Sequence, residues 1–164
     1  MRELIELASR REDCSLLPPA GQPALADGRR IPDDLRAFYD QCGGLLFDWN
    51  IPIGVVPPAR VVPANPVILN DEAAGDISSW WHIVAESDQG SAAERITIDL
   101  HPDRLGRCYN SFWDRHAMPG STEVVAATFT ELLERIIAFE GEDDELFPYW
   151  LGDDFEPLAD AYDD

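Results

Sequence analysis

The sequence predicts an α+β fold, with a mixed, mostly antiparallel β-sheet and helices packed on one of its faces. An amphipathic helix pattern opens the main part of the chain, several short strand patterns follow, and a second amphipathic helix pattern closes the series. Helix, strands and helix in this order are typical of a sheet that is covered on one side. At 164 residues the chain fits a single domain, which can bury roughly 70% of the surface that its unfolded chain exposes.

The first of these helices is predicted to begin near Pro32. Proline suits the first turn of a helix, and the carboxylates of Asp33 and Asp34 would face the positive end of the helix dipole. Apolar residues follow at the spacing i, i+3, i+4 and i+7, namely Leu35, Phe38, Tyr39 and Cys42. This spacing predicts one buried stripe that includes Cys42, and the glycine pair at 43–44 ends the helix.

Strands are predicted at residues 45–49, 80–85, 95–100, 106–112 and 123–126. Residues 95–100 alternate apolar and polar side chains, which indicates a strand with one buried face. The prolines between Pro52 and Pro66 exclude a regular central strand, so we expect an edge strand and a loop there. Residues 70–79 are polar enough for a loop or one exposed helical turn.

The closing helix is predicted to begin at Thr128, because Thr128 and Glu131 match a capping box that satisfies free backbone N–H groups. Its apolar face would consist of Leu132, Leu133, Ile136 and Ile137. These patterns together define a main domain at residues 31–140.

Two further segments flank this domain. Residues 1–30 are expected to hold a short helix at 3–11 and then a proline-rich arm without a helix or strand. Residues 141–164 form a strongly acidic segment, and from Glu140 onwards the chain has 11 acids and no base. Apolar residues are spaced among these acids, which predicts that the segment folds back onto the domain.

The charge of the chain is unevenly distributed. The formal net charge is −20, of which residues 1–60, with 9 acids and 7 arginines, supply −2 and residues 61–164, with 23 acids and 5 arginines, supply −18. Such a field repels phosphate backbones, so we expect no direct nucleic-acid binding, while a basic protein partner would be attracted. The alternative is that the acidic surface only keeps the protein soluble.

The absence of lysine excludes several kinds of chemistry. A P-loop, a protein-kinase site, a pyridoxal Schiff base and a lysine nucleophile all require a Lys amine. The three cysteines form no C-x-x-C pair, which indicates neither a disulfide framework nor a zinc knuckle. No apolar run approaches the roughly 20 residues of a membrane span, and residues 1–20 do not resemble a signal peptide. We therefore expect a cytoplasmic protein with no cofactor.

Three histidines are the candidates for acid–base catalysis or nitrogen ligation at neutral pH, namely His82, His101 and His116. Asp114 lies two residues before His116 and could share a strand face with it, but no nucleophile turn accompanies them. The acid clusters at residues 71–72, 143–145 and 153–154 lack the spacing of an EF-hand and are typical of a solvated face. The sequence therefore predicts no catalytic residue and no metal site.

Three tryptophans lie within the predicted domain next to strand patterns. Trp80, Trp81 and Trp113 are expected to be mostly core residues. An exposed tryptophan would instead suit a protein interface, where this residue type often supplies much of the binding energy.

Four segments in order resemble the SUKH superfamily, which includes fungal cell-wall-assembly regulators and many bacterial immunity proteins. The run IPDDLRAFYDQCGGL at residues 31–45 resembles its opening helix, and WHIVA at 81–85 its tryptophan-bearing strand. The run ITIDL at 96–100 resembles its next strand, and ATFTELL at 127–133 its closing helix. The loop at 88–93 departs from the family, because it has one glycine where the family usually has several.

This resemblance implies a non-enzymatic protein that binds another protein, often an immunity protein that neutralises a bacterial toxin. Together with the charge, it suggests a basic toxin, for instance a nuclease domain. An intracellular scaffold or regulator of the same fold is the alternative, and a metal-dependent hydrolase built on the acid clusters is a third hypothesis. The acids expected to contact the partner are Asp71, Glu72, Asp88, Asp143, Asp144, Glu145, Asp153 and Asp154.

Overall fold

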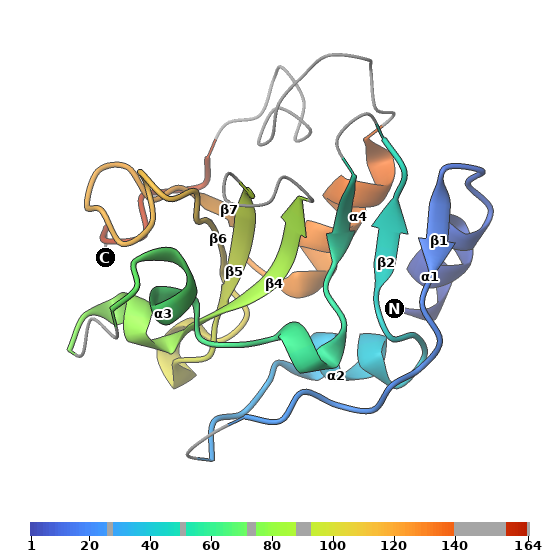
Figure 1. The fold of residues 1–164 in the computed structure, drawn as a ribbon, viewed down its shortest axis with the longest axis horizontal. Coiled ribbons are helices and arrows are strands. Elements are labelled where there is room, and N and C mark those ends of the chain that lie inside the picture. The colour runs from blue at the N-terminus through green and yellow to red at the C-terminus, as the bar shows by residue number, and fades with distance from the viewer. Residues whose placement is uncertain (26–27, 50–51, 72–74, 88–92, 140–156, 164) are drawn as a thin grey trace.

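The computed structural model describes residues 1–25, 28–49, 52–71, 75–87, 93–139 and 157–163. Seven strands form one sheet in chain order, and each neighbouring pair among the described strands is antiparallel (Figure 1). The strands are β1 (Cys14–Leu16), β2 (Leu45–Phe47), β3 (Ile53–Val55), β4 (Trp81–Ser87), β5 (Arg95–Asp99), β6 (Cys108–Asn110) and β7 (Val124–Ala126). The α-helices are α1 (Arg2–Ser9), α2 (Asp33–Tyr39), α3 (Ala64–Ile68) and α4 (Phe129–Ala138). The predicted α+β class is confirmed.

Three of the helices lie together on one side of the sheet. The rings of Phe38 on α2 and Phe129 on α4 meet edge to face with centroids 5.2 Å apart, and α1 packs against α4 and β1. Ile98 pairs with Cys108 across β5 and β6, and both side chains are buried. This face of the sheet forms the apolar core that the predicted stripes of α2 and α4 cover.

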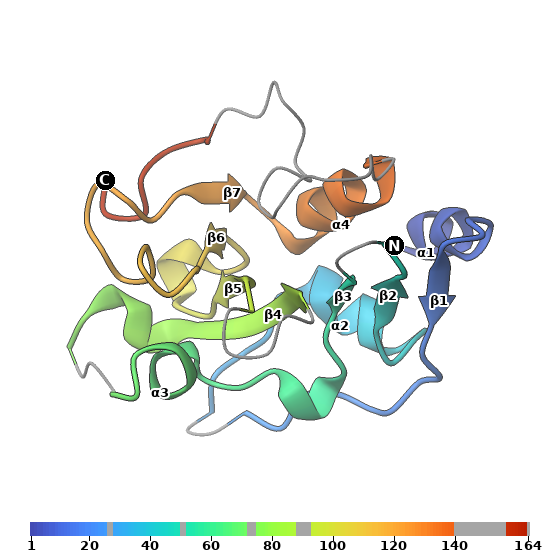
Figure 2. The same ribbon diagram turned by 45° about the horizontal axis from the view of Figure 1, so that its top comes forward.

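The opposite face is covered only in part. Figure 2 shows α3 and α4 on opposite sides of β4. Trp81 and Tyr109 stack on this second face with centroids 4.4 Å apart, and the ring of His116 lies 5.5 Å from that of Trp81. The His116 Nε2 atom is 2.7 Å from the Asn65 Oδ1 atom on α3. The loop that carries His116 and helix α3 therefore close this face over β4 to β6.

Asp34 joins the first and last long helices of the domain. Its Oδ2 atom accepts hydrogen bonds from the backbone N–H and the hydroxyl of Thr130, at 2.8 and 3.0 Å. The predicted cap at Thr128 is also present, since the Thr128 hydroxyl accepts from the Glu131 N–H at 3.1 Å. The Glu131 carboxylate accepts from the Ala127 N–H at 2.8 Å. The free N–H groups at the start of α4 are thus satisfied both by side chains of the helix's own first turn and by Asp34 of α2.

Two expectations about proline-rich segments are wrong. The arm predicted to lack strands contains β1, which pairs with β2 and ends before the first proline at Pro18. The segment predicted as an edge strand contains β3, an internal strand between β2 and β4. Strand β3 is only three residues long and lies between Pro52 and Pro57, so neither proline has to donate a ladder hydrogen bond.

The sequence does not predict helix α3, which contains Pro66. Pro66 is the third residue of α3, where a backbone N–H has no partner inside the helix, so proline removes no hydrogen bond. The helix is held from outside by the Asn65 amide, which donates to the Ser78 hydroxyl at 3.0 Å.

Residues 157–163 run beside β7. The Val124 N–H donates to the Ala159 carbonyl at 2.9 Å, and the Leu158 N–H donates to the Val124 carbonyl at 3.0 Å. The Tyr162 hydroxyl donates to the Asp76 carboxylate at 2.9 Å. This part of the chain thus contacts both β7 and the segment that precedes β4.

Candidate functional site

One of the eight acids predicted to contact a partner can be placed. Asp71 is exposed just beyond α3. The other seven lie outside the described residues, namely Glu72, Asp88, Asp143, Asp144, Glu145, Asp153 and Asp154. The proposed acidic contact surface therefore stays a prediction.

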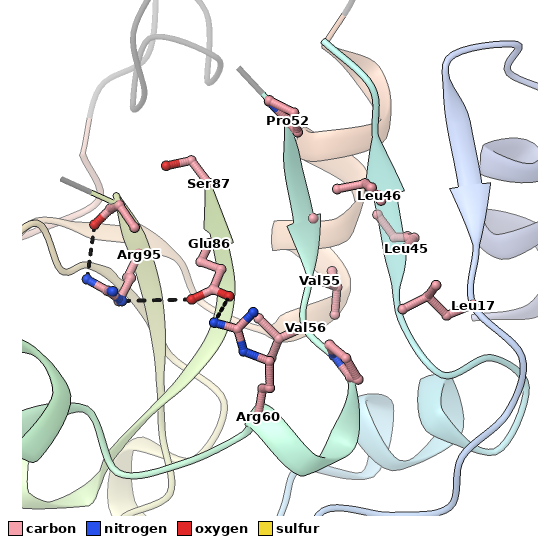
Figure 3. Close-up of a pocket in the computed structure, with 13 residues that line it drawn as sticks. Leu17, Leu45, Leu46, Pro52, Val55, Val56, Arg60, Glu86, Ser87 and Arg95 are labelled. Carbon is pink, nitrogen blue, oxygen red and sulfur yellow. Dashed lines mark hydrogen bonds and ion pairs between the residues drawn. The ribbon is translucent and has the colours of Figure 1, made fainter. Parts of the chain in front are cut away.

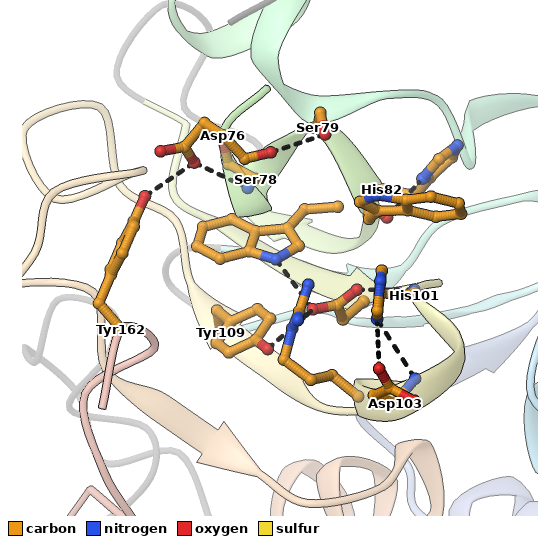
Figure 4. Close-up of polar contacts among 12 residues, drawn as sticks. Asp76, Ser78, Ser79, His82, His101, Asp103, Tyr109 and Tyr162 are labelled. Atoms are coloured by element: carbon orange, nitrogen blue, oxygen red, sulfur yellow. Dashed lines mark hydrogen bonds and ion pairs between the residues drawn. The ribbon is translucent and has the colours of Figure 1, made fainter. Parts of the chain in front are cut away.

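A buried polar cluster surrounds Asp99 at the end of β5, and Figure 4 shows two of its members, Tyr109 and His101. Its Oδ2 atom accepts hydrogen bonds from the Trp81 indole at 3.1 Å, the Tyr109 hydroxyl at 3.0 Å and the Arg104 guanidinium at 2.8 Å. The Oδ1 atom accepts from the His101 N–H at 2.8 Å. A carboxylate with four donors and no exposed surface is suited to hold the sheet and the following turn together rather than to accept a proton from a substrate.

The three histidines occupy structural positions. Burial lowers the pKa of His82 and of His116 to about 4, so both imidazoles are neutral at pH 7. The His101 Nδ1 atom accepts from the Asp103 N–H at 3.2 Å and caps a short 3₁₀ turn (Figure 4). Asp114 is exposed while His116 is buried, so the two do not form the pair that their spacing allowed. Within the described part of the chain, no group of side chains is arranged to hold a metal ion.

A hollow lies on the part of the sheet face that α3 leaves uncovered (Figure 3). Its volume is about 320 Å³. Five of its lining residues come from β2, β3, β4, β5 and the turn at 58–60, namely Leu46, Gly54, Glu86, Arg95 and Arg60. Leu46 pairs with Gly54, Gly54 with Glu86 and Glu86 with Arg95, so these positions form one row across the sheet.

The hollow combines an apolar wall with one charged cluster. The Glu86 carboxylate lies between two guanidiniums, forming an ion pair with Arg60 and a longer contact of 3.8 Å with Arg95. Gly54 also lines the hollow, and a Cβ at this position would collide with the backbone of Leu45 on β2. Such a surface can receive an apolar side chain of a partner, and the hydroxyl of Ser87 in its lining accepts a hydrogen bond from the Glu94 N–H at 2.9 Å. Sequence reasoning missed it, because the cross-strand register that assembles the row is not visible in the chain.

The tryptophans are divided between core and surface. Trp81 is fully buried, and Trp80 is partly covered by the Arg29 guanidinium, which lies 4.7 Å from its ring centroid. Trp113 has 61% of its surface exposed, more than any other large apolar side chain among the described residues. The expectation of a core position is thus wrong for Trp113.

None of the helices in the described part of the chain combines the length and apolar character needed to cross a bilayer.

The fold and these surfaces define an α+β protein with a seven-stranded antiparallel sheet, whose described polar clusters are structural. The chain is 41% identical over 162 residues to the immunity protein YokJ of Bacillus subtilis strain 168, an alignment that covers 98% of this chain and 94% of YokJ. It belongs to the family of that immunity protein. No family model matches the chain, and no solved structure matches it.

Proposed function

We propose that this chain is a non-enzymatic immunity protein, which binds a toxin and neutralises it by forming a complex. The observation that carries the proposal is the relationship to YokJ, because it extends over almost the whole of both chains. The order of motifs between residues 31 and 140 further supports membership of the SUKH superfamily.

The described side chains are compatible with a binding role. Asp99 is saturated with donors, and His82 and His116 are buried and neutral. General acid–base catalysis needs a titrating group that a substrate can reach. The surfaces open to a partner are instead the hollow across β2 to β5 and the apolar side chains that face solvent.

The partner of this proposal is a basic toxin domain in the cytoplasm. The charge of −18 over residues 61–164 would speed its association, and complementary fields can raise association rates to about 10⁸–10⁹ M⁻¹ s⁻¹ at low salt. Residues 31–140 would form the binding domain, with 1–30 and 141–164 as flanking segments. The eight predicted contact acids, from Asp71 to Asp154, would lie at the rim of the interface.

We expect a toxin gene to lie beside this chain's gene, and the test is neutralisation of the toxin that it encodes. We expect that cells expressing this toxin survive only when the chain is co-expressed, and that the two purified proteins form a stoichiometric complex weakened by salt. A toxin that keeps full activity in the presence of an excess of this protein would contradict the proposal. The scaffold or regulator hypothesis, with an endogenous partner, would then be favoured.

A further inference from the structure

The loop at residues 111–122, between β6 and β7, is held in one conformation by its own hydrogen bonds. The backbone N–H groups of Arg115 and His116 donate to the Phe112 carbonyl at 2.9 and 2.8 Å. The Thr122 hydroxyl accepts from the Met118 N–H at 3.1 Å and lies within hydrogen-bond distance of the Arg115 carbonyl. The loop is therefore an ordered projection from the sheet.

The base of this loop is fixed to the core. The His116 side chain is buried between the Trp81 ring and α3, where its Nε2 atom contacts Asn65. On the other side, the Ala161 N–H donates to the Thr122 carbonyl at 2.7 Å. The middle and the C-terminal end of the loop thus rest on buried parts of the molecule, so its outward side chains are presented on a rigid support.

Two large apolar side chains of the loop point into solvent. Trp113 is 61% exposed and Met118 is 49% exposed. Neither side chain fills the core, since the buried residues of this loop are Ser111, His116 and Thr122. Tryptophan is enriched among the residues that dominate binding energy at protein interfaces, and a rigid aromatic loses little conformational entropy when it is bound.

The loop at 111–122 and the adjacent segment at 157–163 together carry an acidic net charge. Asp114 follows it and is exposed, while the charge of Arg115 is shared with Glu123 in an ion pair of 3.3 Å. The adjacent segment at 157–163 contributes Asp160 and Asp163 and contains no base. A partner that covers this loop must therefore offer an apolar pocket bordered by positive charge.

We propose that the loop at residues 111–122 is a docking element for the toxin, with the Trp113 indole entering an apolar pocket whose rim carries Arg or Lys side chains. This inference rests on the immunity function proposed above and assigns it a contact point. Asp114 pairs with the basic rim, and Met118 extends the apolar contact beside Trp113.

The experiment compares variants of the full chain for binding to the purified toxin that is encoded beside this chain's gene, by calorimetry or surface plasmon resonance. Truncation of an interface anchor typically costs at least 2 kcal/mol, so we expect Trp113→Ala to raise the Kd by about 30-fold or more. Asp114→Lys is expected to slow association at low salt, and the difference should shrink as salt is added.

The matched control is Leu7→Ala. Leu7 is 49% exposed on α1, which packs beside β1 at the other end of the sheet from β6 and β7. We expect this variant to bind like the unmodified chain, and both alanine variants to keep the same thermal unfolding midpoint.

The possible outcomes are distinguishable. If the unmodified chain binds and neutralises the toxin but Trp113→Ala binds equally well, the docking inference is wrong and the immunity function stands. If the unmodified chain does not bind this toxin at all, both proposals fail. A Kd that rises only for the Trp113 variant, with an unchanged unfolding midpoint, supports the docking role.

Discussion

Replacement of Asp99 by alanine is expected to destabilise the fold severely. The change would remove the shared acceptor of the Trp81 indole, the Tyr109 hydroxyl and the Arg104 guanidinium. Trp81 and Tyr109 are buried, so their donors could not turn to water. Each unsatisfied buried group costs about 1–3 kcal/mol, and removing one partner of a buried ion pair costs about 3–5 kcal/mol.

These costs overlap, because the same carboxylate serves all of the donors. We therefore expect the free energy of unfolding of Asp99→Ala to fall by about 3–5 kcal/mol, a large part of the 5–15 kcal/mol typical of a whole protein. For a chain of this length the unfolding midpoint would fall by about 6–20 °C. Urea unfolding followed by tryptophan fluorescence measures the change directly.

Asp103→Ala provides the control in the same turn. The Asp103 side chain is 87% exposed, and its carboxylate lies 3.8 Å from the His101 ring. An exposed substitution of this kind is expected to change stability by no more than about 0.5 kcal/mol. A loss below about 1 kcal/mol for Asp99→Ala, or equal losses for the two variants, would refute the structural role of the cluster.

Three further predictions concern single positions. Thr128→Ala should lower the free energy of unfolding by about 1 kcal/mol in urea unfolding, because it removes the hydroxyl that accepts from the Glu131 N–H. Gly54→Ala should prevent soluble folding or lower the unfolding midpoint sharply, because its Cβ would collide with the Leu45 carbonyl oxygen. Glu94→Gln should stabilise the protein at pH 8 by about 1–2 kcal/mol but have little effect at pH 5, as measured by urea unfolding at the two pH values. Burial raises the pKa of Glu94 to about 8, so the unmodified protein loses stability as the pH rises from about 4.5 to 8. The Gln variant does not, because an amide does not titrate in this range.

The parts of the fold that depend on local patterns could be predicted from the sequence. The stripe of α2 and the cap of α4 are set by residues within a few positions of one another, and both helices form where expected. Strands β4 and β5 were also expected from their β-branched and alternating residues. Such patterns report the periodicity of an element and the polarity of its two faces.

The remaining features depend on partners that are distant in the chain. Strands β1 and β3 have three residues each and lie close to prolines, which are typical of loops, and they exist because neighbouring strands pair with them. The bond from Thr130 to Asp34 joins residues 96 positions apart. In the loop between β6 and β7, His116 is buried and Trp113 is exposed. The packing of His116 against Asn65 on α3 determines this arrangement, and that contact joins residues distant in the chain.

The pairing of residues 157–163 with β7 has a consequence for the behaviour of the protein at high concentration. A terminal strand of a sheet offers unpaired N–H and C=O groups that can template association with another chain. At β7 the Leu158 N–H and the Ala159 carbonyl occupy these groups of Val124. The segment at 157–163 therefore covers the edge of the sheet at Val124 and hinders association with another chain there. A chain shortened to end before Leu158 would leave Val124 free to recruit a second molecule.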